Sequence, residues 1–150
     1  IYTIAYTLSL HDALRSRGVA ILVRRRLQFI CTKVWHNKLG RYVGIMGIIQ
    51  GAPVSVLYVY GPPPLSIEFT NVLKKLLIEI LSGFHIVGGD FNGVLDTHLD
   101  RSHNSQLHNT SCTPLARFTQ DSGLLDTWRW LYPGVRGYTF YSGLTTLSLG

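Results

Sequence analysis

The residues best suited to chemistry are Gly88-Gly89-Asp90-Phe91-Asn92, directly after a short apolar segment. In extended backbone, residues two apart point the same way, so Asp90 and Asn92 are expected to face one cleft while Phe91 points into the core. The glycines let another backbone or a phosphate approach closely. A carboxylate can deprotonate water or hold a hard cation, and an amide can orient a nucleophile or stabilise phosphate charge. The pattern fits phosphoryl chemistry, although an isolated Asp-x-Asn also forms ordinary turns.

Four β-rich runs must position this motif, at residues 19–23, 27–34, 42–50 and 54–60, and we expect them to form one antiparallel sheet. Turn residues at 37–40 and 51–53 would join the last three runs as hairpins. Gly61 and three prolines then end strand pairing, because proline lacks the N–H donor.

A helix is predicted next, with Ser66 as its cap and Gly83 as its stop. Its apolar residues recur at three- and four-residue spacing: Phe69, Val72, Leu73, Leu76, Leu77, Ile80 and Leu81. The apolar run 84–88 predicts a strand buried on both sides, with the motif at its carboxyl end. Beyond the motif we expect a loop at 102–113, a helix at 114–122 and a strand at 138–141.

Gly89-Asp90-Phe91-Asn92 after an apolar strand resembles the core motif of the exonuclease-endonuclease-phosphatase superfamily. Other segments resemble, in the same order, parts of the endonucleases of LINE-type retrotransposons. These are residues 17–22, 40–42 and 57–62 before the motif, and 99–102, 123–129 and 138–142 after it. The likeness therefore covers most of the chain.

The resemblance implies an α+β fold, a four-layer α/β/β/α sandwich of the DNase I-like type, formed by residues 17–150. Residues 1–16 stay unassigned, as a leader or a scar. The implied activity is nicking of DNA, with magnesium or manganese as cofactor, to prime reverse transcription. DNA is the implied partner, a reverse transcriptase is expected elsewhere in the same polyprotein, and the expected location is intracellular, in the nucleus.

The same resemblance suggests roles for five residues. Asp90 and Asn92 would activate and orient the attacking water, with Asp90 also a metal ligand. Tyr60 matches a tyrosine that contacts the scissile phosphate, although an aromatic residue at a strand edge is common without any function. Thr139 matches a position that lines the site, and Arg101 could contact the DNA backbone or be an ordinary surface arginine.

The chain also departs from the family pattern. Residues 1–16 offer no counterpart of the family's N-terminal asparagine and glutamate, and the sequence stops before a later aspartate and a terminal Asp-His pair. We therefore expect an incomplete domain that lacks its principal acidic metal ligand, with little or no hydrolytic activity. Unpaired sheet edges are expected to lower its solubility.

Composition agrees with one globular domain that has a polyanionic partner. Of the 150 residues, 46% are hydrophobic, and 14 Lys and Arg against 8 Asp and Glu give a net charge of +6. No apolar run is long enough to cross a bilayer, so no membrane partner is expected. Two alternatives stay open: a sugar- or lipid-phosphate phosphatase of the same superfamily, and a non-catalytic nucleic-acid-binding remnant.

Three further sets of residues have both a structural and a functional interpretation. His98, His103 and His108 suit a solvated loop better than a metal site. Trp128, Trp130 and Tyr132 could stack on bases, but packing against a sheet is the expected reason for their alternation. Arg24, Arg25 and Arg26 fit either a phosphate contact or a solvated turn.

Overall fold

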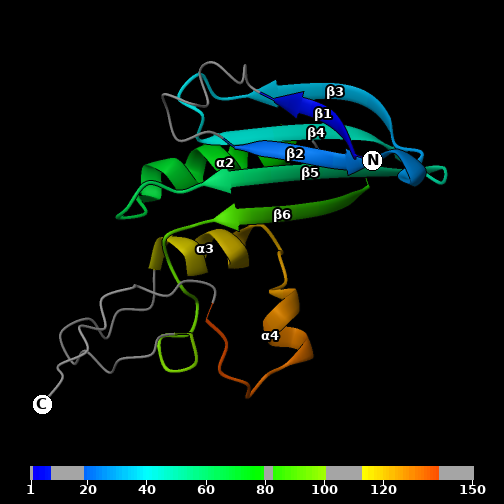
Figure 1. Cartoon of the computed structure of the whole chain (residues 1–150). Helices are drawn as coiled ribbons and strands as arrows, with labels where there is room; N and C mark the ends of the chain where they lie inside the picture. Colours follow the sequence, from blue (N-terminus) through cyan, green and yellow to red (C-terminus); the bar gives the residue numbers. More distant parts are fainter. Residues whose placement is uncertain (1, 8–18, 80–82, 101–112, 139–150) are drawn as a thin grey trace, which may run out of the picture.

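The computed structural model describes residues 2–7, 19–79, 83–100 and 113–138 (Figure 1). The strands are β1 (Tyr2–Thr7), β2 (Ala20–Arg24), β3 (Ile30–His36), β4 (Tyr42–Ile49), β5 (Ala52–Tyr60) and β6 (Phe84–Asp90). The helices are the 3₁₀ turn η1 (Arg25–Leu27), α2 (Ile67–Glu79), α3 (Thr113–Asp121) and α4 (Thr127–Leu131). This mixture is compatible with the expected α+β class.

The strands form two sheets rather than one. A mixed sheet has the order β3-β4-β5-β6, with antiparallel pairing up to β5 and parallel pairing between β5 and β6. The expectation that residues 19–23 join this sheet is wrong, because β2 pairs with β1 in a separate antiparallel sheet. Alternation of apolar residues predicts that a segment is a strand, but it carries no information about its partner.

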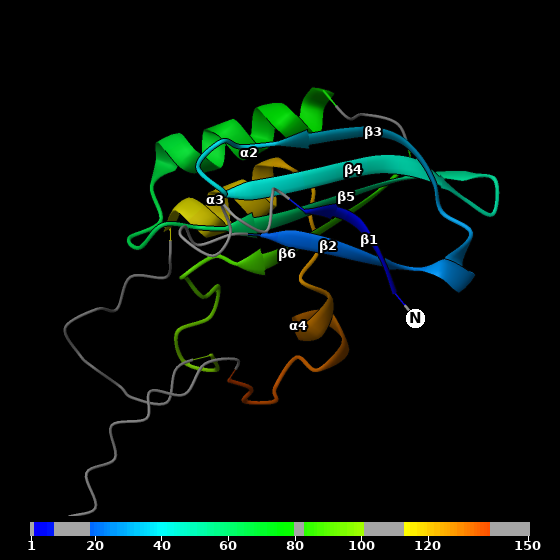
Figure 2. The same ribbon diagram turned by 45° about the horizontal axis from the view of Figure 1, so that its top comes forward.

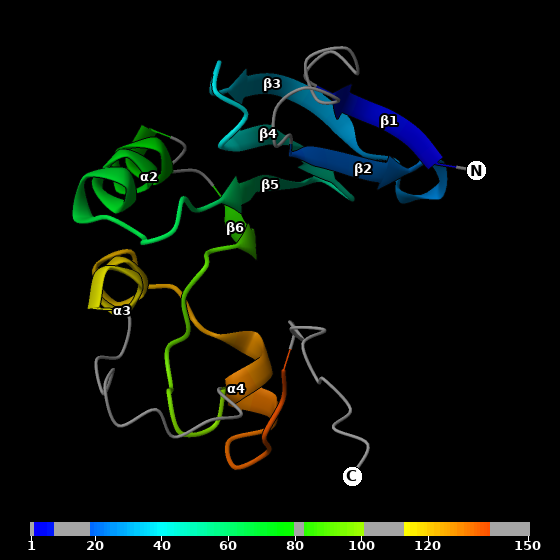
Figure 3. The same ribbon diagram turned by 60° about the vertical axis from the view of Figure 1, so that its left-hand side comes forward.

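The elements around the four-stranded sheet lie in layers. Figures 2 and 3 show α2 and α3 on one side of this sheet, and β1 and β2 on the other. The buried core against the helices consists of Leu57, Val59, Leu65, Leu73, Leu77, Leu115 and Phe118. The core between the two sheets consists of Val19, Ile21, Val43 and Ile45. Each face of the four-stranded sheet therefore has its own apolar contact.

The hairpins differ in detail from the prediction. The β4–β5 turn consists of Gln50 and Gly51, both with positive φ, and Pro53 already belongs to β5, opposite Ile48. This two-residue loop with two left-handed residues matches the right-handed strand twist. Gly40 closes the expected β3–β4 turn by donating its N–H to the carbonyl of Asn37 at 3.0 Å.

The predicted helix forms, and its cap is confirmed. Ser66 Oγ accepts the N–H of Phe69 at 3.2 Å, and Leu73 and Leu77 are buried against the sheet. The strand after it, β6, is not buried on both sides as expected, because 70% of Phe84 and 56% of Ile86 is exposed. β6 is at the edge of this sheet among the described strands, and the second sheet lies over β4, which β2 contacts.

The last described segments agree in part with the prediction. The helix expected at 114–122 is α3, whereas residues 124–132 contain the short helix α4. Most of the loop expected at 102–113 and of the strand expected at 138–141 falls outside the described residues. Within the described ranges, no helix has the length and apolar character needed to cross a membrane.

Candidate active site

The motif lies where two neighbouring parallel strands end. In the register of β5 and β6, Tyr60 lies opposite Asp90, so their side chains share one face of the sheet. Gly61 donates its N–H to the carbonyl oxygen of Asp90 at 2.7 Å, which joins the two strand ends. Gly89 has a φ of +138°, and a Cβ there would lie 1.9 Å from the carbonyl oxygen of Val59. The glycine thus permits the close approach of another backbone.

Asp90 and Asn92 meet through a turn rather than through extended backbone. β6 ends at Asp90, and Asn92 has a φ of +47°, so the expected extended geometry is wrong at Asn92. The N–H of Asn92 donates to Asp90 Oδ1 at 2.9 Å, and Asn92 Nδ2 donates to the carbonyl oxygen of Gly61 at 2.8 Å. The short polar side chain stabilises this local turn, so a turn-forming role and a functional role coincide here.

The turn leaves defined groups available for chemistry. Asp90 and Asn92 are exposed, and Oδ2 of Asp90 has no hydrogen-bond partner in the described part of the chain. Because a carbonyl oxygen only accepts, the bond to Gly61 fixes which end of the Asn92 amide is nitrogen. Asn92 Oδ1 and one side-chain N–H therefore have no partner among the residues that the structure describes. Phe91 packs on the core as expected, with its ring centroid 6.3 Å from that of Phe118.

Tyr60 brings a cation to this cluster. Its ring is partly buried beside the core between the sheets, and Arg41 Cζ lies 5.4 Å from the ring centroid. Tyr60 also donates its backbone N–H to the carbonyl of Arg41 at 2.7 Å. Sequence reasoning gave Arg41 no role, since a single arginine after a turn has no periodic signal. Arg41 directly precedes the strand that pairs with the strand of Tyr60, and this position is the sequence signal that could have indicated a contact between the two residues.

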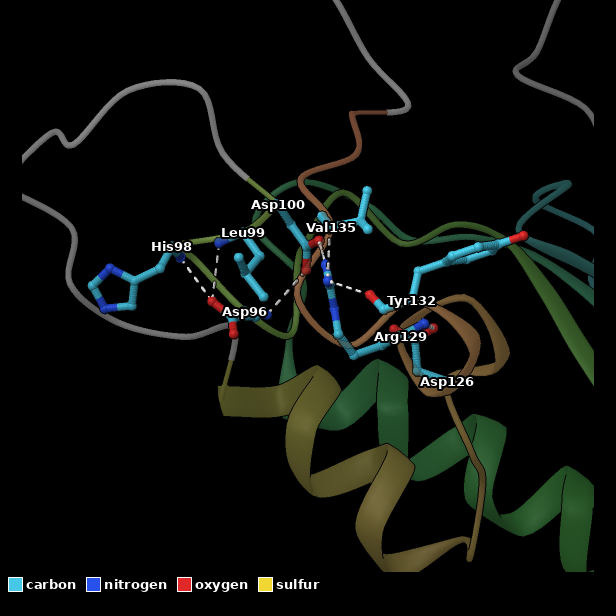
Figure 4. Close-up of polar contacts among 8 residues, drawn as sticks. All are labelled: Asp96, His98, Leu99, Asp100, Asp126, Arg129, Tyr132 and Val135. Carbon is cyan, nitrogen blue, oxygen red and sulfur yellow. Dashed lines mark hydrogen bonds and ion pairs between the residues drawn. The ribbon is translucent and has the colours of Figure 1, made fainter.

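A second polar network fixes the loop that follows the motif (Figure 4). Arg129 forms an ion pair with Asp100 and donates to the carbonyls of Tyr132 and Val135 at 3.1 and 2.9 Å. Asp126 caps α4 by accepting the N–H of Arg129 at 3.0 Å. The network ties the loop at 93–100 to α4, and the sequence patterns did not predict it.

Asp96 organises the turn within this loop. Its Oδ1 accepts the backbone N–H groups of His98 and Leu99, at 2.8 and 3.1 Å. These bonds, the one from His98 first, hold the pKa of the Asp96 carboxyl below its ordinary value of 3.8. The Asp96 carboxylate therefore acts as a structural acceptor for the loop.

The remaining predicted residues are placed only in part. Arg101 and Thr139 lie outside the described residues, as do His103 and His108, while His98 is exposed. The described residues contain no group of three His, Cys, Asp or Glu side chains that could hold a metal ion.

The structure also shows the positions of two sets of residues that had both a structural and a functional interpretation. Trp128 and Trp130 belong to α4 and are at least half exposed, so the expected packing against a sheet is not observed. Arg25 and Arg26 begin the exposed turn η1. No protein-family model matches the chain, so the resemblance drawn from its motifs stays a prediction.

Proposed function

We propose that this chain carries a phosphodiesterase site of the kind found in LINE-type retrotransposon endonucleases, which nick DNA. The observation that supports it is the meeting of Tyr60, Asp90 and Asn92 at the ends of β5 and β6, through the bonds of Gly61 to Asp90 and of Asn92 to Gly61. Clustered polar groups beyond the carboxyl ends of parallel strands are a frequent location of ligand sites.

Each side chain has a role that its free atoms can perform. The unpartnered Oδ2 of Asp90 can accept the proton of an attacking water. The free N–H of Asn92 can donate to a phosphate oxygen or orient that water, since its other N–H is held by Gly61. Tyr60, partly buried opposite Asp90, would contact the scissile phosphate.

The proposed cofactor is magnesium, with manganese as a substitute. The exposed Asp90 carboxylate and Asn92 Oδ1 are hard oxygen ligands, and magnesium commonly uses one or two carboxylates and keeps several waters. Such an ion would polarise the phosphoryl group and lower the pKa of bound water. Because the described residues hold no larger ligand group, we expect weak metal binding and slow or no measurable nicking.

The proposal extends to fold and context. It implies that the helix layer, the four-stranded sheet and the sheet that contains β2 belong to a four-layer sandwich whose expected domain is residues 17–150, with β1 from residues 2–7 paired to β2. It also implies action on DNA in the nucleus, next to a reverse transcriptase of the same polyprotein.

The test compares the wild-type protein with Asp90→Asn on supercoiled plasmid, with and without magnesium. Asparagine keeps the acceptor for the Asn92 N–H and removes the charge, so the turn survives while the general base is lost. We expect any nicking by the wild-type protein to require magnesium and to fall by roughly 10²-fold or more in the variant. Circular dichroism checks that both proteins are folded.

The second candidate is a non-catalytic nucleic-acid-binding domain. It is favoured by the net charge of +6 and by the lack, among the described residues, of a group of three possible metal ligands. Salt-dependent DNA binding without nicking, by folded wild-type protein, would support this candidate. Equal nicking by wild-type and Asp90→Asn would contradict the enzymatic proposal.

A further inference from the structure

Arg41 stands beside the candidate active site on the same face of the sheet. It follows the β3–β4 turn and directly precedes β4, and its carbonyl accepts the N–H of Tyr60. Tyr42 pairs with Val59 in the next position, so Arg41 lies opposite Tyr60, as Tyr60 lies opposite Asp90. The residue before β4 and the last residues of β5 and β6 therefore place a guanidinium, a phenol ring and a carboxylate in one row.

Among the described residues, the guanidinium of Arg41 has at least one hydrogen-bond donor without an acceptor. It lies over the Tyr60 ring, and its Nη1 is buried without any hydrogen-bond partner among the described residues. The ion pairs of the described part join Lys74 to Asp121 and Arg129 to Asp100, and neither includes Arg41. Stacking uses the face of a guanidinium and leaves its in-plane N–H groups free, while a buried donor without an acceptor costs free energy.

A phosphodiester is the ligand that fits this arrangement. Its two non-bridging oxygens match the fork of N–H groups on a guanidinium. A phosphate beside the Asp90 carboxylate is repelled unless a cation lies close, and Arg41 supplies that charge from the other side of Tyr60. Lys38 is exposed in the β3–β4 turn before Arg41. It adds a second positive charge at the end of the sheet where β5 ends.

We infer that Arg41 binds a backbone phosphate of DNA and that the Tyr60 ring holds its guanidinium in place for this contact. The inference rests on the proposed function, since it adds a phosphate-binding residue to the same site. Arg41 is only partly buried as a residue, so part of its side chain faces solvent, while the unpartnered Nη1 is the buried donor that a phosphate would satisfy. Because the contact is to phosphate, its loss is expected to weaken binding to the same extent for all DNA sequences.

The test measures the affinity of a short fluorescein-labelled DNA duplex by fluorescence polarisation over a series of salt concentrations. Arg41→Gln is expected to weaken binding about tenfold and to reduce the slope of log affinity against log salt by about 0.9. Arg117→Gln is the matched control, because Arg117 is an exposed arginine on α3, in the helix layer. It removes the same charge and should change affinity less than about twofold.

Arg41→Lys covers the case in which the glutamine variant does not fold. Lysine keeps the charge without the planar fork, so its affinity should fall between those of the wild-type protein and Arg41→Gln. Equal losses in the Arg41 and Arg117 variants would overturn the inference, and so would a wild-type protein that does not bind the duplex.

Nicking assays of the same proteins separate this inference from the proposed function. Binding that depends on Arg41, in a protein that never nicks, would support the phosphate contact and refute the nuclease. Nicking with unchanged kcat and KM in Arg41→Gln would leave the nuclease standing and overturn the role of Arg41.

Discussion

Gly89 is the residue on which the geometry of the motif depends most directly. Its φ of +138° is rarely accessible to residues with a side chain, and the carbonyl oxygen of Val59 occupies the place of a Cβ. At Gly88, the preceding residue, an added Cβ would meet no atom within 4 Å. One of the two glycines is therefore required by the backbone, and the other is not.

We expect Gly89→Ala to lower the free energy of unfolding by about 2 kcal/mol or more, because a forbidden φ and a backbone clash add up. Gly88→Ala should be nearly neutral, since alanine is favoured over glycine in a strand and meets no atom within 4 Å. Urea unfolding of both variants measures the difference. Similar losses of stability in the two variants would contradict this assignment.

At the residue scale, the sequence predicted which residues pack or allow a close approach better than it predicted their backbone angles. The glycines were expected to allow a close approach, and Gly89 does so toward Val59. The position of Phe91 was also predicted, because it depends only on apolar character. The turn at Asn92 was not, since alternation assumes extended backbone and carries no sign of a positive φ. The role of Arg41 was not predicted, because its stacking on Tyr60 joins residues that are distant in the sequence.

At the scale of elements, the loop after the motif is held by hydrogen bonds to two carboxylates as well as by the packing of Leu95 on the core. The Asp96 carboxylate accepts two backbone N–H groups, and Asp100 accepts the N–H of Asp96 at 3.2 Å while pairing with Arg129. These bonds need charged carboxylates to be strong. The loop should therefore loosen in acid before the apolar core does.

Asp96→Asn tests this pH dependence. The pKa of Asp96 is lowered in the folded protein, so its carboxylate stabilises the fold above its ordinary value of 3.8, and this stabilisation is lost as the pH falls through the folded pKa. The wild-type protein should exceed the variant in urea midpoint near neutral pH, and the gap should close in acid. A gap of constant size at all pH values would show that charge is not the cause.

Segments were predicted more reliably than their partners. β4, β5, α2 and α3 lie close to the expected ranges, because strand alternation, the Ser66 cap and helical spacing are local signals. The separate pairing of β2 with β1 and the edge position of β6 depend on contacts between distant segments. No local pattern encodes them.

At the scale of the whole molecule, one face of β6 has no covering layer among the described residues. Phe84 and Ile86 share the face that carries Asp90, and both are largely exposed beside a strand edge with which no described strand pairs. An exposed apolar edge strand favours pairing with other chains. We therefore expect this protein to associate at high concentration.

Ile86→Lys should reduce this association, because a lysine on an edge strand opposes strand pairing. Leu39→Lys is the control, because Leu39 is an exposed leucine in the β3–β4 turn. The substitution adds the same charge away from β6. Sedimentation velocity over a concentration series measures both. An equal effect of the two lysines would point to net charge rather than to the β6 edge.

The contact of Gly89 with Val59 also sets the alignment of β6 along β5. Sliding β6 by one residue in one direction would bring the Cβ of Asp90 against the Val59 carbonyl, where no Cβ fits. Sliding it the other way would place Gly88 there, but all side chains of β6 would change face and Val87 would leave the core. Gly89 therefore fixes the register of β6 on β5, and with it the position of Asp90 at the end of the strand.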